Sequence, residues 1–415
     1  MIPEEWELRT LQDCGITVID GDRGKEYPSS DDFFDEGYCL FLSAKNVTKA
    51  GFVFDNCQFI NETKHKQLRK GSVQPGDLVL TTRGTVGNVG YLRDLNGFGA
   101  VRINSGMVVV RNSQKCIETD FLHALFRSPV VEKQIERMNF GSAQPQLTVK
   151  IVNSLKLPIP PVRERQRITG ALETWDRAIV TVEALIANAR AQKQALMQQL
   201  LTGKRRLPGF DAPWRERSLE SVFQFKKGQG LSKEAVTPDG VRPCILYGEL
   251  YTRYPEVIRE VVGRTNANDG FPSMAGDVLI PASTTTTGID LANATAILEG
   301  DVLLSGDINI LRPKDTKQSA PFFAYLLTHN LKQKIASRAQ GITIVHLYGA
   351  HLKPLTVFVP EAQEQHAIAS IIMEADDEIL RLEAQLTALR QEKAALMQQL
   401  LTGKRRVKLP ESEVA

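Results

Sequence analysis

Two stretches of the chain place apolar residues in a heptad pattern, with spacings that alternate between four and three. The first seam consists of Ile168, Leu172, Trp175, Ile179, Val182, Ile186, Ala189, Lys193, Leu196 and Leu200. The second consists of Ile368, Ile372, Ala375, Ile379, Leu382, Leu386, Leu389, Lys393, Leu396 and Leu400. Nine of the ten positions in each seam are apolar. A pattern sustained over four heptads predicts two long coiled-coil helices.

Both predicted helices have marked ends. Pro160-Pro161 and Pro360 stand where a helix would begin, and Gly203 and Gly403 stand where it would stop. About 40 residues at 1.5 Å each give a helix of roughly 60 Å. Each seam holds one lysine at the same position. Such a lysine either fixes the pairing register or extends along the helix to reach water, and the sequence leaves both open.

The two helices end in the same twelve residues, because Ala195–Arg206 and Ala395–Arg406 both read ALMQQLLTGKRR. The offset of 200 residues persists upstream, at Glu164 and Glu364, Asp176 and Asp376, Leu147 and Leu347, Ser105-Gly106 and Ser305-Gly306, and Gly76-Asp77 and Gly276-Asp277. Near the start it drifts to 208, where Trp6 matches Trp214. The chain is therefore a duplicated unit, with a variable part followed by a preserved helix.

This repeat sets the expected domain boundaries. Module one spans residues 1–160, the first preserved helix 161–207, module two 208–360, the second helix 361–406, and a tail 407–415. Short β-type runs at 77–82 and 276–280 are bounded by glycine and proline, and a helix is expected near 119–137 and 319–337. The predicted fold class is α+β, with two mixed modules separated by an antiparallel two-helix coiled coil.

Charge favours pairing of the two helices with each other. Residues 162–201 carry six Lys/Arg and four Asp/Glu, a net charge of +2, whereas residues 362–401 carry three and seven, a net charge of −4. Opposite signs favour the mixed pair. Antiparallel packing would carry the chain out along one helix and back along the other. Pairing of either helix with a partner protein stays open.

The composition limits the cellular setting. The 415 residues are 42% hydrophobic with a net charge of +3, which permits two cores and neither supports nor excludes nucleic-acid binding. No apolar run is long enough to cross a bilayer, and the polar N-terminus is not typical of a signal peptide. The five cysteines are widely spaced, at 14, 39, 57, 116 and 244. We expect a cytoplasmic protein without a membrane association.

Catalytic motifs do not emerge from the sequence. The Gly203-Lys204 segment lacks the remaining residues of a phosphate loop, and Gly84 to Gly90 has the wrong spacing for dinucleotide binding. The six histidines show no metal-ligand spacing, and residues 376–378 are expected to form a solvated acidic face. The chain is therefore expected to be a non-catalytic binding subunit that holds neither metal nor cofactor.

The preserved segments resemble those of the specificity subunits of Type I restriction–modification systems. The similarity rests on Leu157–Pro161 with Glu164–Gln166, on Ala195–Arg206, and on the second copy at 357–406. The tract Gly76–Gly87 also resembles the family's GD…G…G stretch.

This resemblance implies that each module is a target recognition domain for one half of a bipartite, asymmetric double-stranded DNA site. It implies that the coiled coil spaces the two domains and docks two methyltransferase subunits. Those subunits would bind S-adenosylmethionine, extrude an adenine from each half-site and methylate it. Restriction/translocase subunits would complete the assembly. A rod of roughly 60 Å matches about 17 base pairs of DNA.

Arginine, lysine, asparagine and glutamine side chains dominate DNA contacts. On this basis the candidate DNA-binding residues are Lys64, Lys66, Arg69, Lys70, Arg83, Gln144, Lys226, Lys227, Arg253, Arg264, Thr284, Thr285, Thr286 and Thr287. Gln144 belongs to a family-like G-S/T-x-Q-x-x-L stretch, from which 341–347 departs by lacking the glutamine. The threonine run is a candidate for phosphate contacts, and an exposed threonine-rich strand is the alternative.

Two other functions stay open for this sequence. A two-headed adaptor could grip two proteins with its variable modules, and DNA binding by the chain with its partners would argue against it. A self-contained nuclease or methyltransferase would show turnover on DNA with S-adenosylmethionine alone.

Overall fold

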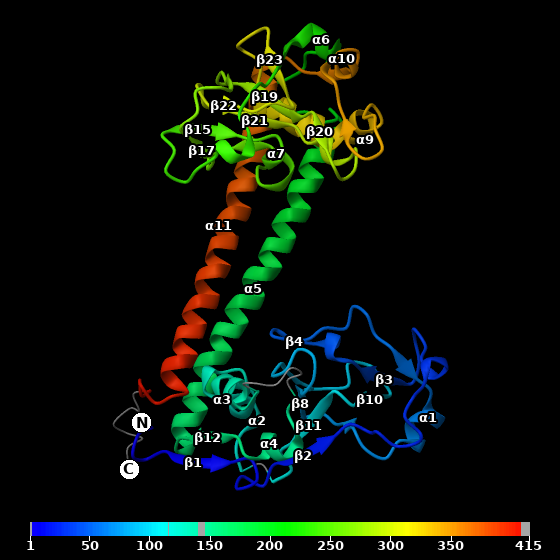
Figure 1. Cartoon of the computed structure of the whole chain (residues 1–415), viewed down its shortest axis with the longest axis vertical. Helices are drawn as coiled ribbons and strands as arrows, with labels where there is room; N and C mark the ends of the chain where they lie inside the picture. Colours follow the sequence, from blue (N-terminus) through cyan, green and yellow to red (C-terminus); the bar gives the residue numbers. More distant parts are fainter. Residues whose placement is uncertain (1, 115, 140–145, 408–415) are drawn as a thin grey trace. The chain divides into compact units, whose positions relative to one another are not determined.

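The computed structural model describes residues 2–114, 116–139 and 146–407, with the side chain of residue 139 left out. It forms two compact units, each containing one module and parts of both long helices (Figure 1). Unit 1 comprises residues 1–183 and 385–415, and unit 2 comprises residues 184–384. The division cuts through both helices, because opposite ends of each helix pack with different modules.

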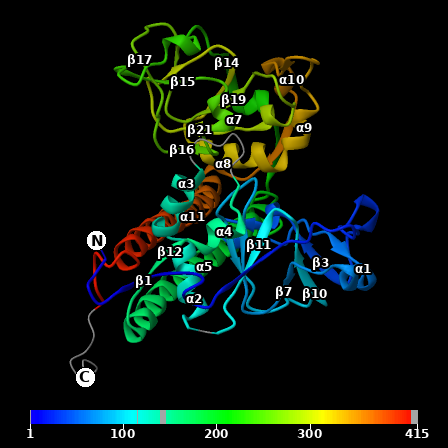
Figure 2. The same ribbon diagram turned by 60° about the horizontal axis from the view of Figure 1, so that its bottom comes forward.

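The two long helices are α5 (Val162–Leu200) and α11 (Ala362–Leu400), of 39 residues each. Their segments lie side by side within each unit in both ribbon views (Figures 1 and 2). In unit 1, Arg390 Nη2 lies 2.6 Å from Glu183 Oε1, and the Lys393 ammonium pairs with Asp176. The partner number falls as the number along α5 rises, so the helices run antiparallel, as the sequence predicted.

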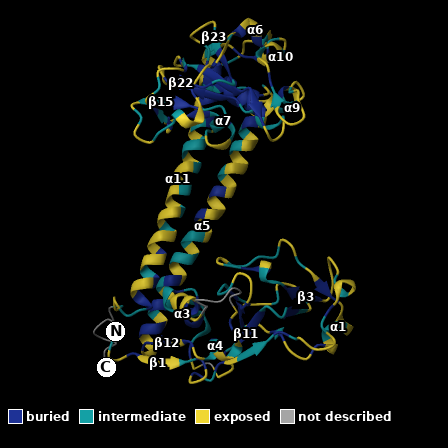
Figure 3. Ribbon diagram, viewed as in Figure 1, coloured by how far each residue is buried: buried dark blue, intermediate teal, exposed yellow. Residues whose placement is uncertain are grey.

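Unit 2 repeats this arrangement. Arg190 Nη2 lies 2.5 Å from Glu383 Oε1, and Lys193 Nζ lies 2.6 Å from Asp376 Oδ1. All twenty seam positions are buried or half-buried, whereas most of their neighbours are exposed (Figure 3). The heptad prediction is therefore confirmed at the level of single residues.

The seam lysines do not extend into water. The side chains of Lys193 and Lys393 are 13% and 11% exposed, and each pairs with an aspartate of the opposite helix. The aspartates, Asp176 and Asp376, are themselves equivalent in the repeat. The polar seam position is thus a charge pair used twice, an arrangement that specifies register.

The expected solvated face at 376–378 is wrong for Asp376. Its carboxylate accepts a hydrogen bond from the Tyr325 hydroxyl at 2.6 Å as well as the charge of Lys193. Asp377 is half-buried and pairs with Arg259, and only the third residue of the run is exposed. Sequence could not show this, because Tyr325 and Arg259 come from module two and are far from these residues in the chain.

The repeated ALMQQLL tract packs into the module cores. Met397, Leu400 and Leu401 join the core of module one, and Met197 and Leu200 join that of module two. One helix end therefore contacts both the opposite helix and a module. The chain then turns at Gly203 and Gly403, whose φ values of 68° and 70° confirm the predicted glycine stops.

The Lys-Arg-Arg ends also hold the beginning of the opposite helix. In unit 2, Arg206 donates two hydrogen bonds to Glu364, at 2.7 and 2.8 Å, and the Trp214 indole donates a third at 3.3 Å. Unit 1 has the same arrangement around Glu164. Both carboxylates are nearly inaccessible, at 2% and 3% exposed. These equivalent contacts explain the final arginine of the repeated ending.

Module one contains an antiparallel sheet in the order β2-β11-β8-β9 and a mixed sheet in the order β6-β3-β10-β7, of four strands each, among its described residues. Their bounds are β2 (Thr17–Asp20), β3 (Cys39–Leu42), β6 (Phe59–Ile60), β7 (Ser72–Val73), β8 (Leu78–Thr81), β9 (Val89–Tyr91), β10 (Ala100–Ile103) and β11 (Met107–Arg111). Two further pairs are β1 (Glu7–Thr10) with β12 (Lys156–Ile159), and β4 (Val47–Thr48) with β5 (Gly51–Phe52). Only β3 and β10 pair in parallel among these.

Module two repeats both orders, as β14-β23-β19-β21 and β17-β15-β22-β18, and adds β16 beside β21. The bounds are β14 (Phe223–Lys227), β15 (Arg242–Ile245), β16 (Val257–Ile258), β17 (Arg264–Thr265), β18 (Phe271–Pro272), β19 (Asp277–Pro281), β21 (Thr295–Ile297), β22 (Leu303–Leu304) and β23 (Ile308–Pro313). The remaining pairs are β13 (Arg215–Ser218) with β25 (Thr356–Val359), and β20 (Ser283–Thr284) with β24 (Val345–His346). The predicted duplication and α+β class are confirmed.

The repeated Gly-Asp dipeptide has a structural role. Asp77 accepts a hydrogen bond from the Gln74 amide at 2.7 Å and pairs with Arg111 across the sheet at 2.6 Å. Asp277 makes the same contacts with the Met274 amide and Arg312, both at 2.8 Å. Each aspartate is buried. The motif thus closes the turn before β8 or β19 and anchors the neighbouring strand.

The single helices expected at 119–137 and 319–337 are wrong in detail. Module one has α2 (Thr119–Phe126) and α3 (Pro129–Asn139), because Pro129 cannot donate the hydrogen bond that would continue α2. Module two has α8 (Ala320–Tyr325), a π-helical turn (Leu326–Asn330) and α9 (Lys332–Ala336). The shorter helices are α1 (Glu62–Gln67), α4 (Val149–Asn153), α6 (Leu219–Val222), α7 (Glu249–Thr252) and α10 (Gly349–Leu352). None of the helices in the described ranges is both long and apolar enough to cross a membrane.

Candidate nucleic-acid interface

Three loops of module one meet at one end of its first sheet. The turn between β10 and β11 presents the Gly106 carbonyl, which accepts hydrogen bonds from the amides of Thr82 and Arg83 in the loop after β8. The loop after β2 approaches from the other side, where Arg23 donates to the Ser105 carbonyl at 3.2 Å. Gly21 makes this approach possible, since a Cβ there would lie 2.2 Å from the Asn104 carbonyl oxygen.

The predicted basic stretch joins the same loops through Asp22. Its carboxylate accepts hydrogen bonds from the amides of Arg69 and Lys70, at 2.7 and 3.3 Å. Burial opposes ionisation of Asp22, but these backbone donors and that of Gly24 outweigh it and lower its pKa. The side chains of Arg69 and Lys70 are exposed and have no partner in the described part of the chain.

Lys64 and Lys66 are used locally instead. Lys64 on α1 pairs with Asp32 at 3.2 Å and is 14% exposed, and Lys66 pairs with Glu62 one turn away at 2.8 Å. An ion pair reduces the net charge that either lysine could offer to phosphate. The cationic side chains of this stretch without an ion pair in the described residues are therefore Arg69 and Lys70, which follow α1.

Arg83 is exposed on the loop after β8. With the Gln146 amide turned so that its oxygen faces the arginine, Gln146 accepts two hydrogen bonds from the guanidinium, at 2.8 and 3.2 Å. Gln146 belongs to the stretch in which Gln144 was predicted to contact DNA, and Gln144 itself lies outside the described residues. Arg83 thus lies on a loop that contacts the turn at 105–106, and Arg69 and Lys70 lie on a segment joined to that turn through Asp22 and Gly21.

Module two builds the equivalent turn at Ser305-Gly306. Gly228 follows β14 and packs on the Ser305 carbonyl, where a Cβ would approach to 1.9 Å. Lys226 and Lys227 end β14, and both are exposed. Lys227 Nζ lies 3.6 Å from Asp307 Oδ1, whereas Lys226 has no partner in the described ranges. Two of the predicted cations therefore stand at the same place in the fold as the cationic turn of module one.

The other predicted cations of module two lie elsewhere. Arg253 follows α7 and pairs with Glu249 at 2.7 Å. Arg264 is half-exposed on β17, which lies on the opposite side of module two from β20 (Figure 1). The structure does not bring these two residues together with Lys226 and Lys227 by any described contact.

The threonine run is only partly exposed. Thr284 is 1% exposed, and its hydroxyl contacts that of Thr286 at 2.7 Å. Thr286 and Thr287 are exposed but donate to Asp290 at 2.6 and 3.1 Å, which lowers the pKa of that carboxyl. Thr285 is exposed. Burial thus removes Thr284 from direct contact with a phosphate, and the alternative of an exposed strand is also wrong at that position.

Sequence reasoning missed three residues near these turns. Arg23 lacks a motif, and its position beside the turn follows only from the sheet. His346 and Tyr348 flank Leu347, a position that aligned with Leu147. For His346 and Tyr348, the available signal was a histidine and a tyrosine two positions apart in a tract that differs between the two copies.

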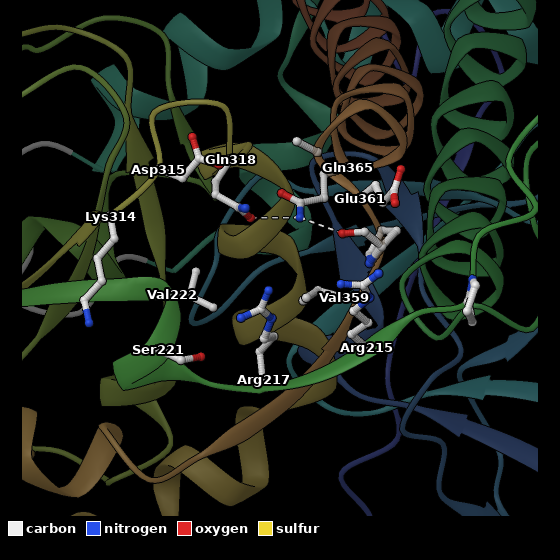
Figure 4. A pocket seen from close by; sticks show the side chains of 13 residues that line it. Arg215, Arg217, Ser221, Val222, Lys314, Asp315, Gln318, Val359, Glu361 and Gln365 are labelled. Carbon is white, nitrogen blue, oxygen red and sulfur yellow. Dashed lines mark hydrogen bonds between the residues drawn. The ribbon is translucent and has the colours of Figure 1, made fainter.

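A separate cationic cavity of about 250 Å³ lies at the other end of β14, beside the start of α11. Arg215 and Arg217 extend from one face of β13 toward Gln318 and Glu361 (Figure 4). Both arginines are exposed, and neither has a partner in the described part of the chain. Gln365 donates to Gln318 at 2.9 Å and closes one wall. Such a cavity suits a carboxylate or a phosphate.

Comparison with known proteins identifies the family. The family model described as the Type I restriction modification DNA specificity domain matches twice, over residues 3–189 and 212–389. The chain belongs to this family of specificity subunits. The two matches coincide with the duplicated units found in the sequence, and the adaptor alternative has no support among the matched proteins.

Relatives that match over nearly their whole length support this family assignment. The chain is 22% identical to a putative type I restriction enzyme specificity subunit, MjaX, of Methanocaldococcus jannaschii, over 98% of this chain and 95% of the relative. Two solved structures share the fold. One, of a type I restriction–modification system described for its assembly and conformational transition, has a TM-score of 0.61 at 19% identity and covers 98% of this chain and 100% of that chain. The other, a specificity subunit from M. genitalium, has a TM-score of 0.57 at 16% identity and covers 96% of both chains.

Proposed function

We propose that each module of this specificity subunit reads one half of a bipartite DNA site. The observation that carries this proposal is a pair of equivalent Ser-Gly turns, at 105–106 and 305–306, that have different cationic residues beside them in the two modules. Two modules with the same backbone arrangement but different side chains are suited to bind two different DNA sequences. Arg69, Lys70 and Arg83 serve the first half-site, and Lys226 and Lys227 the second, chiefly through phosphate contacts.

The paired helices would set the length of the unread gap. Support comes from the antiparallel pairing in each unit and from the charge pairs that fix its register. A heptad inserted into both α5 and α11 adds about 10 Å, or roughly three base pairs of DNA.

The test maps methylated adenines in cells that carry the complete system with this insertion. We expect methylation at the original gap length to be lost. Retention of the original gap would refute the spacer role, and a variant with matched substitutions at exposed helix positions controls for assembly.

The remaining subunits would dock on the helices and on the cavity beside α11. The helices expose large apolar side chains, including Val180 at 62% in unit 1 and Leu380 at 53% in unit 2. Such residues are typical of surfaces that a partner covers. The proposed partners are two methyltransferase subunits, which would bind S-adenosylmethionine, and restriction/translocase subunits.

The chain itself would be non-catalytic. Purified chain incubated with DNA and S-adenosylmethionine is expected to transfer no methyl group until methyltransferase subunits are added. A cytoplasmic location fits the five cysteines, all of which are free.

A further inference from the structure

Module two has a groove that the interface described above does not explain. It measures about 410 Å³, the size of a small-molecule site, and lies between the end of β14, strand β24 and the start of α10. Its walls include Phe225, Lys226, Lys227, Asn309, His346 and Tyr348. Two of these residues are the cations already placed at the DNA-facing turn.

Two aromatic rings form one wall. His346 and Tyr348 are stacked, with ring centroids 5.8 Å apart and planes inclined by 15°. His351 packs against the tyrosine in a T-shaped arrangement, with ring centroids 5.5 Å apart. Tyr348 is 51% exposed and belongs to none of the core clusters in the described residues. A large exposed ring that contributes to no core is available as a platform for a ligand.

The backbone holds this platform in place. His346 pairs with Ser283 in the β20–β24 ladder and exchanges two backbone hydrogen bonds with Gln340, at 2.7 and 2.8 Å. Leu347, between the two aromatic residues, is fully buried, and its carbonyl accepts from the Asn309 amide group at 2.8 Å. The backbone that carries the rings is therefore fixed before any ligand arrives, which reduces the entropic cost of binding.

The chemistry of the groove matches a nucleotide. Stacked aromatic rings accept the face of any base, and adjacent lysines accept the phosphates that flank it. Lys226 has no ionic partner in the described ranges, and Lys227 has one distant partner at 3.6 Å. Base pairs within a duplex present only edges to a protein, so a base that stacks on Tyr348 must have left the helix.

We propose that this groove binds one unpaired nucleobase of the DNA, stacked on Tyr348 and His346, with Lys226 and Lys227 on the flanking phosphates. The inference rests on the proposed function, in which a partner enzyme extrudes an adenine and leaves the opposite base unpaired. Module one has Gln146 and Thr148 at the equivalent positions. The groove therefore belongs to the second half-site alone.

The experiment measures binding of the purified chain to two labelled duplexes of identical sequence, one fully paired and one with a single bulged thymine, by fluorescence anisotropy. We expect the wild-type chain to bind the bulged duplex about tenfold more tightly. Tyr348→Ala should reduce this ratio to about one, and Tyr348→Phe should preserve it. Phe358→Ala, which removes another exposed ring of module two, should leave it unchanged.

A wild-type ratio of one would overturn the inference, as would a Tyr348→Ala variant that weakens both duplexes equally. Loss of the preference in Tyr348→Phe would also overturn it, since that variant keeps the ring. Failure to bind either duplex contradicts the proposed function instead. Binding of the paired duplex without any gain from the bulge contradicts the groove assignment alone. Thermal unfolding of each variant shows whether the fold is intact.

Discussion

Arg406 and Glu164 are 242 residues apart in the chain and form a bidentate ion pair, with Arg406 Nε and Nη2 at 2.6 and 2.8 Å from the two carboxylate oxygens. The Trp6 indole donates to the same carboxylate at 3.0 Å. The end of the second long helix is thereby fixed to the beginning of the first. Arg206 and Glu364 form the same contact in the other unit.

Removing one partner of this pair should destabilise unit 1. Arg406→Ala leaves the buried Glu164 carboxylate without its counter-ion, and we expect a loss of about 2–3 kcal/mol in the free energy of unfolding. Urea denaturation measures it. Arg405→Ala, at the exposed neighbouring position, should cost less than about 0.5 kcal/mol. Equal effects of the two substitutions would contradict the role assigned to the ion pair.

The two seam lysines should respond differently to replacement by leucine. The partner of Lys393, Asp176, is 48% exposed and can be hydrated, so Lys393→Leu should stabilise the helix pair by about 1 kcal/mol. Lys193 faces Asp376 and Glu256, which are 23% and 15% exposed, so Lys193→Leu should cost about 2 kcal/mol. Hydrogen exchange measured on peptides from each helix separates the two effects. Shifts of the same sign in both variants would refute this explanation.

His123 should make the protein sensitive to acid. Burial, followed by the charges of Arg127 and Arg93, lowers the pKa of His123 to about 3, and its Nε2 has no hydrogen-bond partner. The unfolded chain takes up a proton below about pH 6.5, whereas the folded chain does not, so stability is full above that pH and falls as the pH drops toward 3. Module two has Phe323 at the equivalent position.

His123→Phe should therefore gain about 2 kcal/mol in the free energy of unfolding at pH 5 relative to its effect at pH 7.5. Urea denaturation at the two pH values gives this difference directly. The measurement at pH 7.5 is the control, because at that pH the substitution changes packing while His123 is largely unprotonated in the unfolded chain as well. An identical effect at both values would show that His123 already binds a proton in the folded protein.

Substitutions in the cavity beside α11 should impair assembly with the methyltransferase subunit and leave DNA binding intact. Replacing Arg215 and Arg217 together by alanine removes two unpaired guanidinium groups from the wall of the cavity. We expect affinity for the methyltransferase subunit to fall at least about tenfold. DNA binding by the chain alone should be unchanged, and Lys226→Ala should show the reverse pattern. A pull-down titration and anisotropy measure the two affinities, and a loss of DNA affinity in the double variant would place the cavity on the DNA face.

The amino-acid sequence alone predicted the long helices, their ends and the duplication, and its charge distribution favoured pairing of the two helices. These features depend on local periodicity, on glycine and proline at helix ends and on repeated segments, all of which can be recognised in the amino-acid sequence. It also indicated Lys226, Lys227, Arg69, Lys70 and Arg83, which remain exposed in the structure.

Which of the predicted side chains are exposed to a ligand, and which are buried or already paired, follows from the three-dimensional fold. Thr284 is buried, and Asp376 accepts a hydrogen bond from Tyr325 of module two. The expected helix at 119–137 is interrupted before Pro129, where a second helix begins. The stacked pair of His346 and Tyr348 depends on a strand pairing with Ser283, which is more than 60 positions away. Burial, ion pairing and ring stacking are set by residues brought together from distant parts of the chain, and no local pattern encodes those partners.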